Sequence, residues 1–483
     1  MRKLSDDERD VLYRLHAQLV ARSERNSLRS KYAEGEWRLR KLGASIPPGM
    51  DVMQVPVSWP DKAVKTFASR MKPEFFSMRA QSSLIDDLYD VYADNDMAYV
   101  ERLAIASAVR HGVSFVFTSR GDTSMGEPEV LVTVRSALSA TAILDSRSGL
   151  TRAALEVLDD ARVNLYLPGV VLECSRSAGG WDVAEEYPTG TRRVLCSPYV
   201  HDATTEKPLG QSRITPTVMG LTDAGVRTLL RQEVSAEFYS APRMALLGGD
   251  PSIFKDESGR WIPGWELLIG AVWGVPDVSS HEDPDMPDNL RRASIEQFSQ
   301  MSMQPFSDQL RTIASQLSGA TSIPMQYLGV VQDSNPTSAA AIEASEQDLV
   351  NDVRYQYPSL ARGRKSLAGD VLTVLHGGFD DSMWADFRTV EPRWAEPRNR
   401  SLTEVSQYVA LQVQTGNFQP GTEDTLRQLP LSEEDVKLHA AANRRGNTMN
   451  LAERLASAAG QAVEDETVAE LVSARGSAEP DAS

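Results

Sequence analysis

The densest group of ionisable side chains in this sequence lies between His281 and Asp288. Because hard divalent cations prefer oxygen ligands, its carboxylates could hold such an ion. These carboxylates are Glu282, Asp283, Asp285 and Asp288. The spacing does not fit a calcium-binding loop, because the required glycine is missing and two prolines restrict the backbone. We therefore favour a solvated acidic loop, or a contact surface for a basic partner, over a metal site.

Three tryptophans precede this acidic group, in a stretch rich in glycine and proline. They are Trp261, Trp265 and Trp273. Their rings could form a platform for a ligand, but a small apolar core beneath a loop-rich module is the simpler interpretation. Residues 250–288 are accordingly predicted to form a compact, irregular insertion.

The rest of the sequence offers little catalytic chemistry. It contains no GxxxxGKS/T phosphate loop, no GxGxxG after a strand, no HExxH zinc motif and no GxSxG nucleophile elbow. Its six histidines are scattered, and nothing pairs them with a nucleophile. Cys174 and Cys196 exclude a disulfide scaffold and a four-thiolate zinc site, and leave open a single bridge. We predict no catalytic residue, metal or cofactor.

Length and charge narrow the class of protein. The chain has 483 residues and a mass of 53.1 kDa, so about two to four domains are expected. With 50 basic and 67 acidic residues, its net charge of −17 argues against a broad basic surface that clamps nucleic acid. The longest uncharged stretch, residues 312–332, has eight Ser, Thr or Gln residues and is not expected to span a membrane. We expect a soluble protein of a reducing compartment.

The beginning of the chain predicts helices. The capping box Ser5-Asp6-Asp7-Glu8 marks the start of an N-terminal helix within residues 1–42. This segment holds eleven basic and seven acidic residues, a local excess of positive charge in an acidic chain. A short strand over Val55–Trp59 and a helix opened by Pro60 should follow, and residues 84–111 form another predicted helix.

The hydrophobic period then changes from 3.6 to 2, which is typical of strands. The predicted strands begin at Val113, Val130, Ala153, Val163 and Val170, with glycines between several of them. Residues 43–200 are therefore predicted to form an α+β domain with an antiparallel sheet.

Long helices dominate the second half of the prediction. Thr222 is a predicted N-cap, and the apolar positions Val226 to Phe238 mark one helical face. Another helical pattern resumes after Pro287. A third follows Pro336 for about 40 residues, far beyond the usual 11–12, which indicates an elongated or oligomeric architecture. Its expected bends are Pro358, Gly363 and Gly369.

Four groups of residues occur along the chain in an order and spacing that are typical of one protein family. The first includes Arg25-Asn26, Ile46-Pro47-Pro48 and Trp59-Pro60; the second Gly210–Ile214, Leu221–Arg227 and Glu237–Pro242; the third Ile323–Gly329, Asn335–Ile342 and Glu346; the fourth Gly416 and Leu431-Ser432. Together they resemble the portal (head–tail connector) proteins of bacteriophages with long non-contractile tails. The resemblance spans residues 20–445. It departs from the family at Ala224-Gly225, a pair that would soften a helix.

The resemblance implies a helix-rich α+β fold with the portal regions called wing, stem, clip and crown, and with long stem and wing helices. Its segments would be the N-terminal helix at 1–42, the wing at 43–221, the stem helices at 222–248 and 288–322, the clip at 249–287, the tunnel-loop region at 323–338, the long wing helix and its return at 339–399, the crown at 400–445 and a partly disordered acidic tail at 446–483.

The same resemblance implies which residues meet DNA and partners. The tunnel-loop residues that would line the channel are Gly329, Val330, Val331, Gln332, Asp333, Ser334 and Asn335. The partner-binding residues of the clip would be Trp261, Trp265, Trp273, Glu282, Asp283, Asp285 and Asp288.

A portal protein forms a ring, usually of twelve copies, at one capsid vertex and has no enzymatic activity of its own. The implied partners are other copies of the chain, the terminase large subunit, the major capsid and scaffolding proteins, a head–tail adaptor, and double-stranded DNA that passes through the channel. The implied location is the portal vertex of the virion, after assembly in the host cytoplasm. An acidic chain suits a channel through which DNA must slide, because a basic lining would hold the phosphates.

Two other functions stay open at this point. The first is a metal-dependent enzyme that uses the acidic group at 281–288. The second is a monomeric scaffold or adaptor built from long helices.

Overall fold

A computed structural model describes most of the chain up to residue 445. The described residues are 2–37, 39, 55, 57–79, 82–239, 244–247, 255, 258–261, 294–297, 301–330, 338–398, 402–429, 431, 435–436 and 438–445. They belong to two compact units, Met1–Pro397 and Arg398–Ser483, and each unit is described by itself.

The first long helix, α1 (Asp6–Glu34), starts as its sequence predicts. Ser5 Oγ accepts from the Glu8 backbone N–H at 3.3 Å, and the Glu8 carboxylate accepts from the Ser5 N–H at 2.8 Å. The helix ends before residue 42, because Gly35 takes a left-handed φ of 72° and its N–H bonds back to carbonyls of the last turn. The N-terminal helix is therefore shorter than expected.

Two antiparallel sheets form the β part of the first unit. The larger has the order β1-β9-β8-β7-β6-β5 and the smaller the order β10-β3-β4. Their strands are β1 (Arg2–Lys3), β3 (Val113–Arg120), β4 (Val130–Ser136), β5 (Ala140–Leu144), β6 (Thr151–Val157), β7 (Arg162–Leu167), β8 (Val170–Ser177), β9 (Gly180–Pro188) and β10 (Cys196–Val200). The five strands predicted from Val113 onward are confirmed, and β1, β5, β9 and β10 are additional. The strand expected over Val55–Trp59 is wrong, because Trp59 already belongs to a helix.

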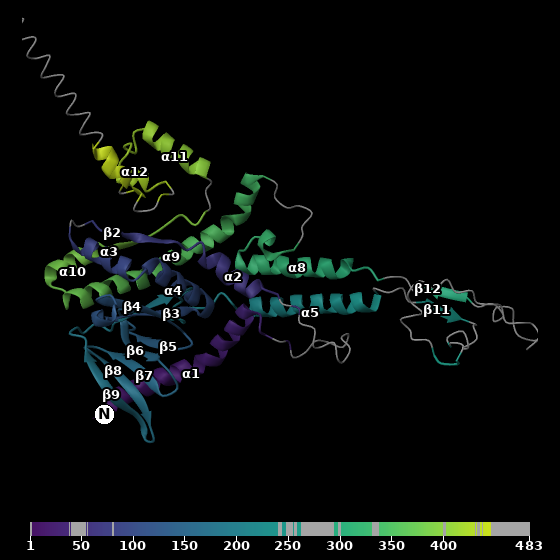
Figure 1. Cartoon of the computed structure of the whole chain (residues 1–483), viewed down its shortest axis with the longest axis horizontal. Helices are drawn as coiled ribbons and strands as arrows, with labels where there is room; N and C mark the ends of the chain where they lie inside the picture. Colours follow the sequence, from purple (N-terminus) through teal and green to yellow (C-terminus); the bar gives the residue numbers. More distant parts are fainter. Residues whose placement is uncertain are drawn as a thin grey trace, which may run out of the picture. The chain divides into compact units, whose positions relative to one another are not determined.

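Alternation along β3 shows how the layers stack. Phe115 and Phe117 face the larger sheet and join a core with Tyr166, whereas Val116 faces the helices. The opposite face of the larger sheet is covered by α1, which inserts Leu12 and Leu15. The order of layers is thus helices, small sheet, large sheet and α1, as Figure 1 shows.

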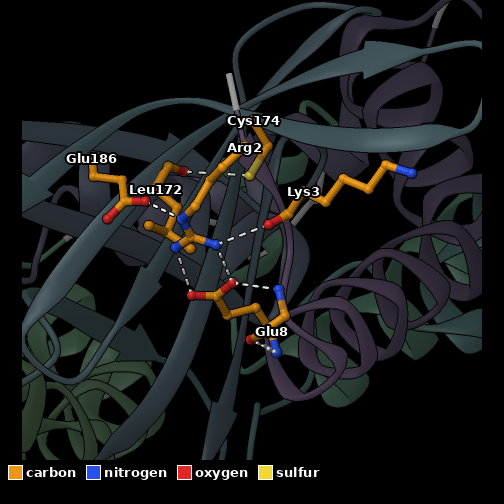
Figure 2. A network of polar contacts seen from close by, with 7 residues as sticks. Arg2, Lys3, Glu8, Leu172, Cys174 and Glu186 are labelled. Carbon is orange, nitrogen blue, oxygen red and sulfur yellow. Dashed lines mark hydrogen bonds and ion pairs between the residues drawn. The ribbon is translucent and has the colours of Figure 1, made fainter.

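The start of the chain is fastened to the edge of the larger sheet. β1 pairs with β9, and the Arg2 guanidinium binds Glu8 at 2.8 Å as well as Glu186 on β9 (Figure 2). The hydrogen bond from Arg2 lowers the pKa of Glu8 to about 2. On the neighbouring strand β8, the Sγ of Cys174 lies 3.8 Å from the Leu172 carbonyl oxygen. This network ties together β1, α1 and β9.

The helical layer of the first unit consists of several helices around one apolar core. They are α2 (Trp59–Ala68), α3 (Leu84–Asp94), α4 (Met97–His111), α9 (Ala339–His376) and α10 (Asp381–Arg388), next to a two-stranded sheet of β2 (Pro73–Ser77) and β13 (Glu391–Trp394). The helix expected over 84–111 is two helices, because the chain turns at Asp96, which has a φ of 46°.

The predicted third long helix is confirmed as α9, and it continues through all three of the expected bends. Its glycines serve close packing. A Cβ on Gly363 would lie 2.6 Å from the Pro198 carbonyl oxygen of β10.

Two further helices, α5 (Pro216–Tyr239) and α8 (Gln304–Thr321), lie side by side and lead toward the paired strands β11 (Met244–Leu247) and β12 (Ser294–Gln297) (Figure 1). Between α8 and α9 comes a short 3-10 turn, η3 (Met325–Leu328); another, η1 (Thr123–Met125), lies between β3 and β4.

The predicted stem boundaries 222–248 and 288–322 differ from these helices, because 244–247 and 294–297 are strands. Thr222 is not a cap. It lies inside α5 and donates its hydroxyl to the Val218 carbonyl at 2.8 Å, whereas Thr215 Oγ1 accepts from the Val218 N–H.

The second unit contains α11 (Leu402–Gln414) and α12 (Glu423–Leu426). The sequence Ser401-Leu402-Thr403-Glu404 is a capping box that predicts a helix ending at Gly416, and Gly416, with a φ of 77°, does follow α11. Ser401 itself, Ser432 of the second predicted capping box at 432–435, and the tail at 446–483 lie outside the described residues.

Candidate functional site

The candidate site is the segment that joins η3 to α9, where the sequence predicts the tunnel-loop region. Gly329 ends η3 with a left-handed φ of 73° and is followed by Val330, which packs partly against the core around Trp59. Of the predicted loop residues, these two are described. The other five, Val331, Gln332, Asp333, Ser334 and Asn335, lie outside the described residues.

The N-terminal side of this segment is anchored to α2. The indole Nε1 of Trp59 donates to the Leu328 carbonyl at 3.1 Å, and both side chains are buried. Trp59 also packs against Ile323 and Leu317 in one apolar cluster. The residues at the N-terminal side of the segment are therefore held in place by packing and a hydrogen bond.

Its two sides are joined by a polar contact. The Tyr327 hydroxyl before the segment donates to the carboxylate of Glu346 on α9. Arg70, in the turn after α2, completes the group, with 2.9 Å to Glu346 and 3.1 Å to the Tyr327 oxygen. Burial and the nearby Glu346 raise the pKa of Tyr327, so its hydroxyl stays protonated and can donate. We call Trp59, Arg70, Tyr327 and Glu346 the loop anchor.

The α5–α8 pair meets the loop anchor at Trp59. A Cβ on Gly225 would lie 2.7 Å from Cζ3 of the Trp59 ring, so only glycine lets α5 approach this closely. The sequence marks Ala224-Gly225 as a weak helix pair; the structure shows that the missing side chain makes room for the indole.

Arg213 links the end of α8 to α9. It donates to Asp352 on α9 at 2.8 Å and to the Thr321 carbonyl at the end of α8. Its guanidinium also stacks on the Phe67 ring, 4.0 Å from the ring centre. One arginine thus fixes α2, α8 and α9 relative to one another.

Farther along α9, Arg364 forms a fully buried ion pair. It binds both carboxylate oxygens of Glu101 on α4, at 2.7 and 3.2 Å, and donates to backbone carbonyls of Glu74 and Arg393 at 2.7 Å. The Tyr199 hydroxyl donates to the same carboxylate at 3.0 Å. Burial opposes the charge on Arg364, but Glu101 outweighs it and raises the pKa of the guanidinium.

Asp370, near the end of α9, is also buried. It accepts from Arg193 and, at 2.6 Å, from the Ser197 hydroxyl on β10. Burial raises the pKa of Asp370 against the opposing effect of Arg193. These contacts and the Arg364 pair fasten α9 to the sheet and to α4.

Within the predicted clip, Trp261 is described and is 66% exposed. It pairs with Lys255 in an isolated antiparallel bridge, and the Lys255 Nζ lies 5.3 Å from the ring centre. The other predicted clip residues, Trp265, Trp273, Glu282, Asp283, Asp285 and Asp288, lie outside the described residues.

The described residues contain no group of three or more His, Cys, Asp or Glu side chains that could hold a metal ion. Both cysteines are buried and free, so the single bridge left open by the sequence is not formed. Burial raises the pKa of Cys174 to about 11, which keeps the thiol protonated. Of the described helices, none is long and apolar enough to cross a membrane.

Sequence patterns alone predict where the segment lies but miss the ion pairs that hold it. Their partners are far apart in the chain; Arg70 and Glu346, for example, are separated by most of it. The one available signal is that charged residues such as Arg364 and Asp370 interrupt the apolar face of a long helix.

No family model matches the chain. Two curated relatives do. The portal protein of Mycobacterium phage D29 is 28% identical over 386 residues, which cover 77% of this chain and 76% of that protein. The portal protein of Mycobacterium phage L5 is 25% identical over 378 residues, or 76% and 74% of the two chains. The resemblance to phage portal proteins is thereby confirmed for about three quarters of the chain.

Solved structures with a similar chain come from gene transfer agent particles. The neck of the empty particle aligns with a TM-score of 0.45 and 13% identity, covering 82% of this chain and 95% of the other. The native virion aligns with a TM-score of 0.42 and 13% identity, covering 77% and 90%.

Proposed function

We propose that this protein is a phage portal protein, which forms a ring at one capsid vertex and serves as the conduit for DNA packaging and ejection. The observation that carries this function is the match of about three quarters of the chain to two portal proteins. This match favours the conduit over the metal-dependent enzyme. The ring is expected to hold twelve copies.

The way in which α8 is buried supports an oligomer. Within one chain it buries one face, formed by Ile313, Ala314, Leu317 and Thr321, while Phe306 and Leu310 are only half-buried. An 18-residue helix with one covered face leaves other faces for neighbouring copies. In the proposed ring, α5 and α8 form the stem, β11 and β12 lead to the clip, and the first unit's sheets form the wing.

The loop anchor supports the proposed role of residues 329–335 as the tunnel loop. A segment that contacts moving DNA needs fixed ends, and Trp59 and the Tyr327–Glu346 contact supply them. The clip would dock the terminase large subunit during packaging and a head–tail adaptor afterwards, and the wing would contact the major capsid and scaffolding proteins.

The first test is the native mass of the purified chain in moderate salt, with negative-stain images. A particle near twelve times 53.1 kDa with a central hole is expected. A compact monomer at every protein concentration would contradict the ring and favour the monomeric scaffold.

The clip assignment has its own test. Alanine at Glu282, Asp283, Asp285 and Asp288 should leave the ring intact and weaken binding of the terminase large subunit. The matched control neutralises four acidic residues of the tail, Glu464, Asp465, Glu466 and Glu470, by the same substitution. Equal loss of binding in both variants would show a general charge effect and reject the assignment.

A further inference from the structure

A cavity of about 470 Å³ lies between α1 and the segment that precedes α5. Its α1 wall carries Arg22, Arg25 and Arg29, which recur at steps of three and four and so share one helical face. Lys207 and His111 contribute further nitrogen atoms to the wall. The volume lies in the range of sites that bind small ligands.

Two buried polar atoms of this wall lack a hydrogen-bond partner. Arg29 is 8% exposed; its Nη1 donates to the Asn26 side chain at 3.2 Å and to the His111 carbonyl at 3.1 Å, but its Nε has no acceptor. His111 is 7% exposed, and its Nδ1 is also without a partner. Buried groups of this kind are costly unless a ligand or water satisfies them.

The positive charge of the cavity is not neutralised by the protein. Among the described residues, no carboxylate forms an ion pair with Arg22, Arg25 or Arg29. Burial, with a smaller contribution from Arg25, lowers the pKa of Arg29 to about 10 and also lowers that of Arg22. Arg29 therefore stays charged at neutral pH, and none of the three arginines has a counter-charge in an ion pair with another described residue.

Two acidic residues do line the cavity, and both are engaged elsewhere. The Asp202 carboxylate accepts from the Gln211 side chain at 3.2 Å. Glu206 is exposed, and hydrogen bonds within its own loop lower its pKa. The nearby Lys207 ammonium donates to Gln211 at 2.7 Å. Neither carboxylate compensates the arginines.

We propose that this cavity binds an oxyanion, a carboxylate or a phosphate group, through Arg22, Arg25 and Arg29. The planar guanidinium suits both ligands because its parallel N–H groups match two oxygens at once. The Nε of Arg29 and the Nδ1 of His111 supply further donors at the buried end. The binding itself does not depend on the proposed ring; only the source of the anion does.

The test is calorimetric titration of the full-length protein with inorganic phosphate at low ionic strength. Arg25→Gln and Arg22→Gln should each weaken binding about tenfold, the usual loss when one charge-assisted contact is removed. Arg25 is exposed, so its replacement leaves the core intact. The matched control is Arg14→Gln, an exposed arginine of the same helix outside the cavity, which should bind as the wild type does.

Two results would overturn the proposal: no binding of phosphate to the wild type, or equal weakening by Arg14→Gln and Arg25→Gln. A second titration identifies the source of the anion. If phosphate binds the monomer but not the assembled ring, an acidic side chain of a neighbouring copy fills the cavity. If it binds both, the natural ligand is a free phosphate group. A protein that never forms a ring would still bind phosphate, so the two proposals can fail separately.

Discussion

α9 and the α5–α8 pair are both long helical elements, but they are held in different ways. α9 buries apolar side chains from Leu349 to Leu372, and its charged residues Glu346, Asp352, Arg364 and Asp370 each bind another element. Among the described residues, α5 and α8 share an apolar cluster near Val218 and Leu317, next to Trp59, and α5 also buries Leu230 and Val234 farther from Trp59. Buried ion pairs thus contribute to holding α9, and buried apolar side chains to holding the α5–α8 pair.

This difference matters because the two kinds of contact respond differently to displacement. A buried ion pair adds little net stability, but separating its partners leaves a buried charge uncompensated. Apolar contacts lose energy only in proportion to the area that is exposed. The α5–α8 pair is therefore expected to yield to displacement more gradually than α9. The predictions below test this contrast.

The largest effect is expected at Arg364. Arg364→Met leaves the Glu101 carboxylate buried without a counter-charge, so the free energy of unfolding should fall by about 3–5 kcal/mol. Urea unfolding followed by circular dichroism measures the change. The double variant Arg364→Met, Glu101→Gln should recover part of it, since both charges are then absent. An exposed ion pair contributes up to about 1 kcal/mol. A smaller loss than this in the single variant would show that buried ion pairs do not hold α9 more firmly than apolar packing holds the α5–α8 pair.

Acidic pH should lower the stability of the first unit because His111 must take up a proton on unfolding. Burial and the neighbouring Arg110 and Arg29 lower the pKa of His111 to about 4, from the usual value of about 6.5. The unfolded chain therefore binds this proton more readily, and stability is lost as pH falls from about 6.5 to about 4, by up to about 3 kcal/mol.

The measurement is the urea midpoint in anion-poor buffer over this pH range. His111→Gln should flatten the pH dependence. If the urea midpoint of His111→Gln depends on pH as strongly as that of the wild type, groups other than His111 cause the pH dependence.

Two glycines of α5 allow a matched test of the packing between α5 and Trp59. Gly225→Ala places a Cβ 2.7 Å from the Trp59 ring and should cost about 1–3 kcal/mol by overpacking. Gly220→Ala meets nothing within 4 Å and should stabilise the helix by up to about 1 kcal/mol. Thermal unfolding of both variants shows whether each substitution raises or lowers stability. If both substitutions stabilise, the close contact between α5 and Trp59 is wrong.

Local patterns predict the start of α1 and the strands from Val113 onward, because caps and side-chain alternation act over a few residues. They fail where the same residue type fits two different structural positions. Thr222 has the side chain of an N-cap, yet inside α5 its hydroxyl bonds to the preceding turn. The strands at 244–247 and 294–297 depend on each other across a long insertion, so neither segment alone indicates its pairing.

At the candidate site, the resemblance to portal proteins picks out several residues, but only the structure shows what they do. Trp59, Arg213, Tyr327 and Glu346 all lie in the segments that resemble portal proteins. Their contacts join residues that are remote in sequence, such as Trp59 with Leu328. Spacing along the chain therefore predicts where a tunnel loop would lie, but not the contacts that hold the residues on either side of it.

The smallest predicted effect isolates one of these bonds. Trp59→Phe removes the hydrogen bond to the Leu328 carbonyl and keeps most of the apolar contact, so stability should fall by about 1 kcal/mol. Hydrogen exchange should rise in peptides that cover residues 325–330 and stay unchanged in α9, because α9 is held by its own ion pairs. Trp384→Phe on α10, where the ring is half-exposed, is the control and should affect neither region. Faster exchange along α9 in Trp59→Phe would show that the loop anchor and α9 open together, which would remove the contrast between the two helical elements.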